Sequence, residues 1–292
     1  MKNFFFGVLI LLACCSDTKK MDETADAEFI PTKLAELKGK TLGEVSGLAA
    51  SINNPEMLWA HNDSGNGAEI FLIDQNLNII LTCTLTGVEN RDWEDITVGP
   101  GPEPGKQYVY VADIGDNDAK HKFKFIYRFE EPTITQESKE IKISSFDKIT
   151  FQLSDTKKDT ESLFINPKTK DLYVVSKRED PVYVYELKYP YSTTEELTAN
   201  KILSLPFSKI VAADVSPDGN EILMKNYDKI FYWKSHAPTS INAMLKQPAE
   251  EIPYEVEPQG ESIAWARDGS GFFTLSEKNK DKKSYLYFYK RK

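Results

Sequence analysis

Residues 161–205 alternate between short apolar runs and polar breaks. The runs are rich in β-branched and aromatic side chains, which favour β-strands. The first break opens with Asn166-Pro167, a pair that is typical of turns. The four predicted strands are residues 161–165, 172–177, 181–187 and 201–205. This stretch therefore predicts one unit of four consecutive antiparallel strands.

The first run of this unit recurs at four other places in the chain. The copies are Ser46-Gly47-Leu48-Ala49, Glu94-Asp95-Ile96-Thr97, Glu161-Ser162-Leu163-Phe164, Ala213-Asp214-Val215-Ser216 and Glu261-Ser262-Ile263-Ala264. Each copy is followed by a second and a third apolar run. A repeat at this period indicates that one supersecondary unit is copied and stacked, and four-stranded antiparallel units are the blades of a β-propeller. The sequence predicts an all-β fold, a five-bladed β-propeller.

The ends of the repeat array predict how the ring closes. The last copy contains only three runs, whereas residues 29–37 precede the first copy and belong to none. We expect this N-terminal segment to supply the outer strand of the last blade, which removes an exposed sheet edge. The longest interval between copies contains strand-like sequence at residues 139–153. A six-bladed ring with one degenerate blade is therefore the alternative.

Aligning the copies places acidic residues at a shared position. The first aligned position holds Ser46, Glu94, Glu161, Ala213 and Glu261, and the second holds Gly47, Asp95, Ser162, Asp214 and Ser262. First strands line the channel of a propeller, and their side chains alternate in direction. The sequence does not show which of the two rings faces the axis.

Three glutamates in one ring repel one another, so at least one must take up a proton unless a cation is present. A hard cation with oxygen ligands relieves this repulsion, and calcium is the expected ion. The candidate ligands are Glu94, Glu161, Asp214 and Glu261. The alternative is structural: the acids accept hydrogen bonds from backbone groups or lysines and hold the blades together.

Polar loops follow the second strands at equivalent offsets, so we expect them to gather around one mouth of the channel. Asp, Asn and Gly also form ordinary turns, so one such loop alone is weak support for a site. The candidate ligand-binding residues are Asn62, Asp63, Asn117, Arg178, Lys225 and Glu277. The candidate catalytic residues are Asp113, Asp116 and Lys177.

The composition and charge limit the classes of molecule that the protein is expected to bind. The formal net charge of -9 argues against nucleic acid and against adsorption to anionic membranes. We expect residues 28–292 to form one propeller domain. We also expect the protein to be a monomer. Cys83 is the only cysteine in that stretch, so no disulfide framework is expected. A small polar molecule or an extracellular ligand is the expected partner.

The first residues have the pattern of a targeting segment. Lys2 precedes an apolar run at residues 4–13, which at about ten residues is half the length of a spanning helix. The segment resembles a bacterial lipoprotein signal, residues 1–13, cleaved before a lipidated Cys14. An ordinary secretory signal is the alternative. Residues 14–27 are polar and are expected to tether the domain to the bacterial cell envelope, at the outer membrane or cell surface, by lipid alone.

Several segments together resemble a known group of proteins. They are residues 44–49, 59–65, 92–96, 112–117 and 214–219. They resemble the signature segments of a largely uncharacterised family of secreted bacterial β-propellers, a resemblance that covers nearly the whole domain and implies the fold but no reaction. One carboxylate per inner strand is also distantly similar to phytase-like proteins, senescence-marker lactonases and calcium-activated apyrases. Similarity of fold alone does not transfer chemistry.

Two functions remain open. The first is a surface-anchored binding propeller that holds a ligand at the channel mouth beside an axial cation. The alternative is a calcium-dependent hydrolase of a phosphate ester, a lactone or a similar small polar substrate. A phosphatase needs converging basic groups, and the candidates are Arg91, Lys177, Arg178 and Lys225. No Ser-His-Asp order, glycine-rich phosphate loop or nucleophile elbow is present, so the sequence leaves open whether the protein is an enzyme.

Overall fold

The computed structural model describes residues 1, 28–134 and 139–292. This part of the chain is all-β, which confirms the predicted fold class, and it contains one short helix, α1 (Ile241–Leu245), capped by the Ser240 hydroxyl. No helix among the described residues is long and apolar enough to cross a membrane. Beyond Met1, the predicted signal peptide, Cys14 and the tether lie outside the described residues.

The strands of the described chain form four sheets. The first sheet contains β2 (Val45–Ala50), β3 (Leu58–Asn62), β4 (Glu69–Ile73), β5 (Ile79–Leu85) and β9 (Glu140–Ile143). The eight-stranded sheet runs in the order β11 (Thr160–Ile165), β12 (Leu172–Ser176), β13 (Val182–Leu187), β14 (Leu197–Leu205), β10 (Asp147–Leu153), β8 (Lys124–Glu130), β7 (Gln107–Asp113) and β6 (Trp93–Pro100). The third sheet contains β15 (Ala212–Val215), β16 (Glu221–Lys225), β17 (Ile230–Lys234) and β18 (Glu250–Ile252). The fourth contains β19 (Gly260–Trp265), β20 (Gly271–Ser276), β21 (Tyr285–Arg291) and β1 (Phe29–Glu36).

The eight-stranded sheet consists of two four-stranded halves. Each half is antiparallel throughout, and the one strand pairing between them in the described chain is the parallel contact of β10 with β14, over three residues on each side. The halves, β6-β7-β8-β10 and β11-β12-β13-β14, therefore have the same strand order as the smaller sheets. Their joining strands are the outermost of each half.

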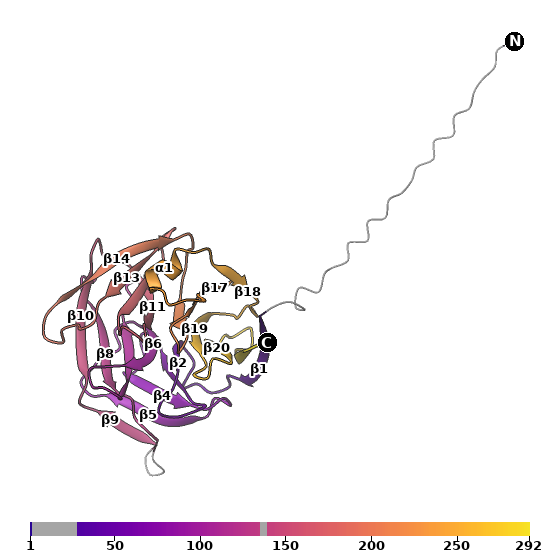
Figure 1. Cartoon of the computed structure of the whole chain (residues 1–292). Coiled ribbons are helices and arrows are strands. Elements are labelled where there is room, and N and C mark those ends of the chain that lie inside the picture. Colours follow the sequence, from indigo (N-terminus) through magenta and orange to yellow (C-terminus); the bar gives the residue numbers. More distant parts are fainter. Residues whose placement is uncertain (2–27, 135–138) are drawn as a thin grey trace.

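We call β2, β6, β11, β15 and β19 the first strands, because each begins one unit of the fold. They contact one another in a closed circuit. In the described chain β2 contacts β6, β6 contacts β11, β11 contacts β15, β15 contacts β19, and β19 contacts β2. Figure 1 shows the sheets arranged around this common centre, with β1, β5, β9, β10 and β14 toward the outside. The arrangement is propeller-like, and it brings the beginnings of all five first strands to one place.

Burial follows the distance of a strand from the centre. Every residue of β2, β11 and β19 is buried, which suits strands that are covered on both faces. In β5, buried side chains alternate with more exposed ones, as expected where one face of a strand meets solvent. The apolar and small residues of the repeated pattern thus suit first strands, in which no face is exposed; the second strands β3, β12 and β20 are buried throughout as well.

The N-terminal strand pairs where the sequence predicts. β1 pairs antiparallel with β21, from Phe29 opposite Arg291 to Glu36 opposite Tyr285. The Phe29 side chain is fully buried against Trp265 and Phe272. This pairing covers the edge of β21 and joins the two ends of the described domain.

The strand-like segment at residues 139–153 does not form a sheet of its own. Its first part, β9, pairs in parallel with β5, and its second part, β10, pairs antiparallel with β8. Both strands therefore extend sheets that already contain one of the five first strands.

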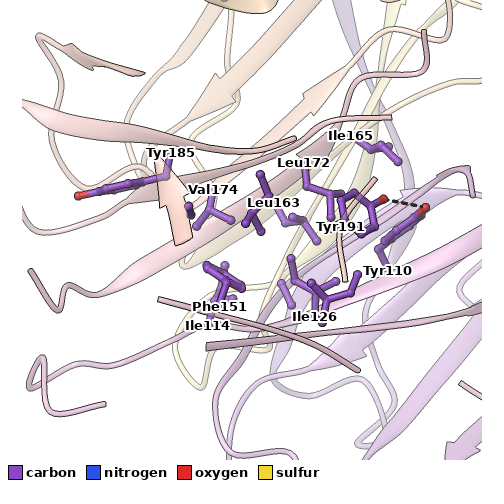
Figure 2. Packing of buried hydrophobic residues seen from close by; sticks show 14 of the residues in the cluster. Tyr110, Ile114, Ile126, Phe151, Leu163, Ile165, Leu172, Val174, Tyr185 and Tyr191 are labelled. Atoms are coloured by element: carbon purple, nitrogen blue, oxygen red, sulfur yellow. Dashed lines mark hydrogen bonds between the residues drawn. The ribbon is translucent and has the colours of Figure 1, made fainter. Parts of the chain in front are cut away.

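Apolar side chains pack between neighbouring units. Figure 2 shows one such layer, in which Leu163 and Val174 of one half of the large sheet pack with Ile126 and Phe151 of the other half. The hydroxyl groups of Tyr191 and Tyr110 hydrogen-bond across the same layer at 3.3 Å. Burial of each large aliphatic or aromatic side chain contributes about 1.5–3 kcal/mol. This packing fixes the first strands around the central ring.

Candidate functional site

Four of the five first strands carry an extra residue at the same position. The pairing with the second strand skips one residue between Val45 and Gly47, Trp93 and Asp95, Thr160 and Ser162, and Gly260 and Ser262. The skipped residues are Ser46, Glu94, Glu161 and Glu261. A β-bulge leaves its extra residue unpaired and redirects its side chain. The fifth strand, β15, pairs without a skip.

Two groups of carboxylates meet at this end of the ring. Asp63, Asp92 and Glu94 each place an oxygen within 4.8 Å of the others, and so do Glu94, Asp159 and Glu161. Glu94 belongs to both groups, and we call these five residues the mouth carboxylates. Asp63 and Asp92 are partly exposed, whereas the other three are buried. The residues come from three separate units of the fold, so only the closed ring brings them together.

Basic side chains contact one of the two groups. Lys177 Nζ lies 2.8 Å from Glu161 Oε1 and 3.9 Å from Glu261 Oε1. Arg178 Nε lies 2.7 Å from Asp159 Oδ2. The group of Asp63, Asp92 and Glu94 contains no such ion pair within 4.0 Å among the described residues. The protein's own cations thus form ion pairs with Glu161 and Asp159, whereas Arg91 and the buried Lys124 act on the outer group only through their charge, from beyond 4.0 Å.

Burial raises the pKa of several of these acids. It raises the pKa of Glu161 to about 7, although the Lys177 ammonium opposes the shift. It raises the pKa of Asp63 to about 6, with the charges of Asp92 and Glu261 adding to the effect. Burial, followed by the charge of Glu161, raises the pKa of Glu94 well above its usual range. A cation at the mouth would remove the electrostatic cost of ionising these groups.

Glu261 and Glu277 form a second acidic pair at the same end. The Tyr227 hydroxyl donates to Glu261 Oε1 at 2.5 Å. Burial, together with the charge of Glu261, raises the pKa of Glu277 to about 8. Lys177 is within 4.0 Å of acids on two different first strands, Glu161 of β11 and Glu261 of β19.

Gly115 leaves space beside the mouth carboxylates. A Cβ at this position would lie 2.1 Å from Glu94 Oε1 and 2.3 Å from Asp92 Oδ2. The Gly115 backbone N–H donates to the Asp92 carbonyl, which holds the loop after β7 against the start of β6. Any other residue would push a side chain between the two carboxylates. The glycine therefore allows both carboxylates to lie close to the backbone of this loop.

A cavity of about 240 Å³ lies next to the mouth carboxylates. Its lining includes Arg91, Asp92, Asp116 and Asn117. Arg91 lies 3.5 Å from Asp113 through Nε and donates to the Phe123 and Asp113 carbonyls. A small polar molecule in this cavity would meet the Asp92 carboxylate as well as amide and guanidinium donors of Asn117 and Arg91.

Several predicted site residues hold the surrounding loops. Asn62 donates to the Thr41 carbonyl at 2.6 Å. Asp113 accepts from the Asp92 backbone N–H at 3.1 Å, directly behind the mouth carboxylates. Asp116 accepts from the backbone N–H groups of residues 120 and 121, and its own N–H donates to Asp159 at 2.9 Å. Asn117 accepts from Arg178. These contacts position Asp92 and Asp159.

Two predicted residues lie away from the mouth carboxylates. Lys225 is fully buried, its Nζ donates to the Gly260 carbonyl, and it faces Glu257 and Tyr254. Asp214 belongs to neither carboxylate group: it accepts from the backbone N–H groups of Trp265 and Val215, each at 2.8 Å. Asp214 lies apart from the glutamates because it occupies the second aligned position, one residue after the position that is bulged in the other four first strands.

Asp95 occupies the position in β6 that Asp214 occupies in β15. It accepts from the Leu163 backbone N–H of the neighbouring first strand at 2.9 Å. Asp214 makes the equivalent bond to Trp265 of β19. This second ring of acids therefore links adjacent first strands, which is the structural role that the sequence analysis kept as its alternative.

Sequence reasoning missed Asp92 and Asp159. A signal for both was present, because Asp92-Trp93-Glu94 and Asp159-Thr160-Glu161 place an aspartate two residues before the aligned glutamate. The aligned positions used to choose candidate ligands begin at the glutamates and so exclude these two aspartates.

Comparisons with known proteins add little. No family model matches the sequence, and no curated protein matches it. Among solved structures, a luciferin-regenerating enzyme is similar with a TM-score of 0.47 and 12% sequence identity, over 90% of this chain and 95% of that chain. A similarity this distant transfers no function.

Proposed function

We propose that the protein is a five-bladed β-propeller that binds one divalent cation, expected to be calcium, at the mouth of its central ring. The cation would be held by Asp63, Asp92 and Glu94. Together with the neighbouring polar loops it would bind a small polar ligand. Calcium would supply positive charge to which oxygen atoms of that ligand can bind.

The blade count rests on the circuit of first strands. Five first strands contact one another in order, and each begins a unit of at least three antiparallel strands. The parallel contact between β10 and β14 involves only their outer edges, so it joins two units without merging them. β9 and β10 add to existing units, which favours five blades over six.

The cation site rests on the outer carboxylate group. Calcium binds oxygen ligands at about 2.3–2.6 Å, so ligand atoms on opposite sides of one ion are about 5 Å apart. Oxygen atoms of Asp63, Asp92 and Glu94 lie within 4.8 Å of one another, which suits this size. Gly115 leaves the space between Glu94 and Asp92 free of a side chain. Among the described residues this group forms no ion pair within 4.0 Å, and that is the single observation that carries the proposal.

Thermal unfolding with calcium and with a chelator tests the cation site. A ligand that binds only the folded state must stabilise it, so we expect calcium to raise the Tm of the wild-type protein. Asp92→Asn should abolish the rise. Glu195→Gln, which removes an exposed acid outside the mouth carboxylates, is the matched control and should keep it. An equal Tm with calcium and chelator would contradict the proposal.

A second candidate function is hydrolysis of a phosphate ester, a lactone or a similar small polar substrate. It is favoured by carboxyl groups whose pKa values lie near neutrality beside the proposed cation, since Asp63 titrates at about 6 and Glu161 at about 7. Such groups can accept or donate a proton at physiological pH. Turnover of a panel of phosphate esters and lactones tests it, and Glu161→Gln should abolish any activity found. Activity that survives the substitution excludes Glu161 from the reaction.

We also propose that Cys14 is lipidated and anchors the protein to the bacterial cell envelope. The support is the sequence pattern of residues 1–15 alone. Metabolic labelling with an alkyne fatty acid should label the wild-type protein, and Cys14→Ser should remove the label. Cys15→Ser is the control and should keep it. Label that depends on Cys15 would contradict the proposed anchor.

A further inference from the structure

A second cavity, of about 370 Å³, lies at the end of the ring opposite the mouth carboxylates. It is formed by the turn between β2 and β3 and the turn between β19 and β20, with Phe273 and Phe288 beside them. Turns after first strands emerge at the opposite end from turns after second strands, because the two strands are antiparallel. The mouth loops follow second strands, so this cavity is separate from the proposed cation site.

Arg267 contributes a positive charge to this cavity. Its Nε donates to the Ala50 carbonyl at 2.8 Å and its Nη2 to the Val98 carbonyl at 2.9 Å. Carbonyl groups satisfy these N–H donors but do not neutralise the charge. Among the described residues no carboxylate lies within 4.0 Å of the guanidinium.

The negative charges that act on Arg267 are those of Asp214 and Glu131, and both carboxylates accept hydrogen bonds from other groups. Asp214 accepts from two backbone N–H groups. Glu131 accepts from the Ser51 hydroxyl, from the Trp59 indole and from the backbone. Neither forms an ion pair with Arg267 within 4.0 Å in the described structure, so an anion that enters the cavity can pair with the guanidinium.

The walls around Arg267 are mostly apolar. The apolar lining residues are Ala50, Ile52, Pro55, Met57, Leu58, Ala266, Phe273 and Phe288. A half-buried cation beside such walls suits a ligand that is apolar along most of its length and negative at one end.

We infer that this cavity binds a small amphipathic anion, an apolar chain that carries one carboxylate. The carboxylate would accept hydrogen bonds from the Arg267 guanidinium, and the chain would lie against Met57, Phe273 and Phe288. A planar guanidinium matches a carboxylate well and favours it over a neutral hydroxyl.

Two acidic residues also line the cavity. Asp268 accepts from the Ser270 backbone N–H and hydroxyl, which holds its carboxylate in the turn. Glu56 is exposed at the rim. The charge of Glu56 opposes an anion, so Glu56→Gln is expected to strengthen binding. A substitution that damages the cavity would instead weaken anion binding, so the two effects can be told apart.

Calorimetric titration with octanoate and with octanol, which share a chain and differ in charge, tests the inference. The wild-type protein should bind one octanoate at least about tenfold more tightly than octanol. Arg267→Gln should bind the two alike, because the charge is lost. Equal affinities in the wild-type protein, or no octanoate binding, would overturn the inference.

Arg267 also links two backbone carbonyls, so its substitution can weaken the fold. Met57→Trp, which fills the cavity and leaves Arg267 intact, provides a second variant. It should reduce octanoate affinity by about tenfold or more while calcium binding at the opposite end is unchanged. Unchanged octanoate affinity in Met57→Trp would place the ligand elsewhere and overturn the assignment.

Discussion

Lys177 Nζ lies 2.8 Å from Glu161 Oε1, and the same ammonium lies 3.9 Å from Glu261 Oε1. A single side chain from the end of β12 thus neutralises acids on two different first strands. Lys177 and Glu161 are both largely buried, so the pair is shielded from solvent and salt. This ion pair offsets part of the repulsion among the acidic side chains of the ring. Within the described part of the chain, Asp63, Asp92 and Glu94 form no ion pair of this kind.

Lys177→Met is therefore expected to destabilise the protein most at alkaline pH. Without the ammonium, the pKa of Glu161 should rise above its present value of about 7. We expect the free energy of unfolding to fall by about 2–3 kcal/mol at pH 8 and by less at pH 5, where Glu161 is protonated. Urea unfolding at both pH values measures the difference.

Lys188→Met is the matched control for this substitution. Lys188 lies 3.7 Å from Glu186, but its side chain is exposed, so its loss should change the free energy of unfolding by less than about 1 kcal/mol. An equal loss at pH 5 and pH 8 in Lys177→Met would show that packing, and not charge, explains the effect.

The acidic mouth also predicts the pH dependence of the wild-type protein. In the folded state the pKa values of Asp63, Glu161 and Glu277 are raised to about 6, 7 and 8. At these three groups the folded state binds more protons than the unfolded chain, so they should lower the free energy of unfolding as pH rises from about 5 to about 7; the lowered pKa of His61 opposes them with a single proton.

Calcium should make this decrease smaller, because it binds the deprotonated carboxylates. Urea unfolding at several pH values, with calcium or with a chelator, measures both effects. Stability that rises between about pH 5 and pH 7 in the presence of chelator would contradict the raised pKa values.

Glu131 should be essential for stability rather than for binding. Its carboxylate accepts from Ser51 Oγ at 2.6 Å, from Trp59 Nε1 at 2.8 Å and from the Ile52 and Asn53 backbone N–H groups at 3.0 and 2.9 Å. In Glu131→Gln an NH₂ group would face one set of donors, so the free energy of unfolding should fall by about 2–4 kcal/mol.

Glu130→Gln removes an exposed neighbouring acid and should cost less than about 1 kcal/mol in the same urea experiment. Calcium binding should be unchanged in both variants. Similar stability of the two variants would mean that the buried network contributes little.

Gly115→Ala should weaken calcium binding without unfolding the protein. The added Cβ would lie 2.1 Å from Glu94 Oε1, so one of the two must move. We expect at least about a tenfold loss of calcium affinity, because carboxylate ligands must be held close to their binding geometry. Gly39→Ala is the control, since a Cβ there meets nothing within 4 Å. Equal affinities of the two variants would remove Gly115 from the site.

Much of the fold could be predicted from the repeated pattern. Strand alternation is a local property of the sequence, so the strands that contain Glu161 and Leu172 were located from apolar periodicity alone. The pairing of β1 with β21 followed from counting runs, because a three-stranded last unit leaves one edge unpaired.

The site was predictable only in part. The alignment found Glu94, Glu161 and Glu261, but the bulges that redirect them depend on pairing with the second strands and leave no local signature. Asp214 was grouped with these glutamates because it is acidic, although it occupies the next aligned position and hydrogen-bonds Trp265. Whether a polar loop residue such as Asn62 faces a ligand or its own loop depends on tertiary contacts that no single sequence shows.

The most direct test of the cation site is equilibrium dialysis of the full protein against radioactive calcium, with Glu94→Gln beside the wild type. Glu94 contributes to both carboxylate groups, so its neutralisation should affect any ion bound there. The account predicts one calcium ion per wild-type chain and at least a tenfold loss of affinity, about 1.4 kcal/mol or more, in Glu94→Gln. No bound calcium in the wild-type protein, or equal binding by both proteins, would contradict it.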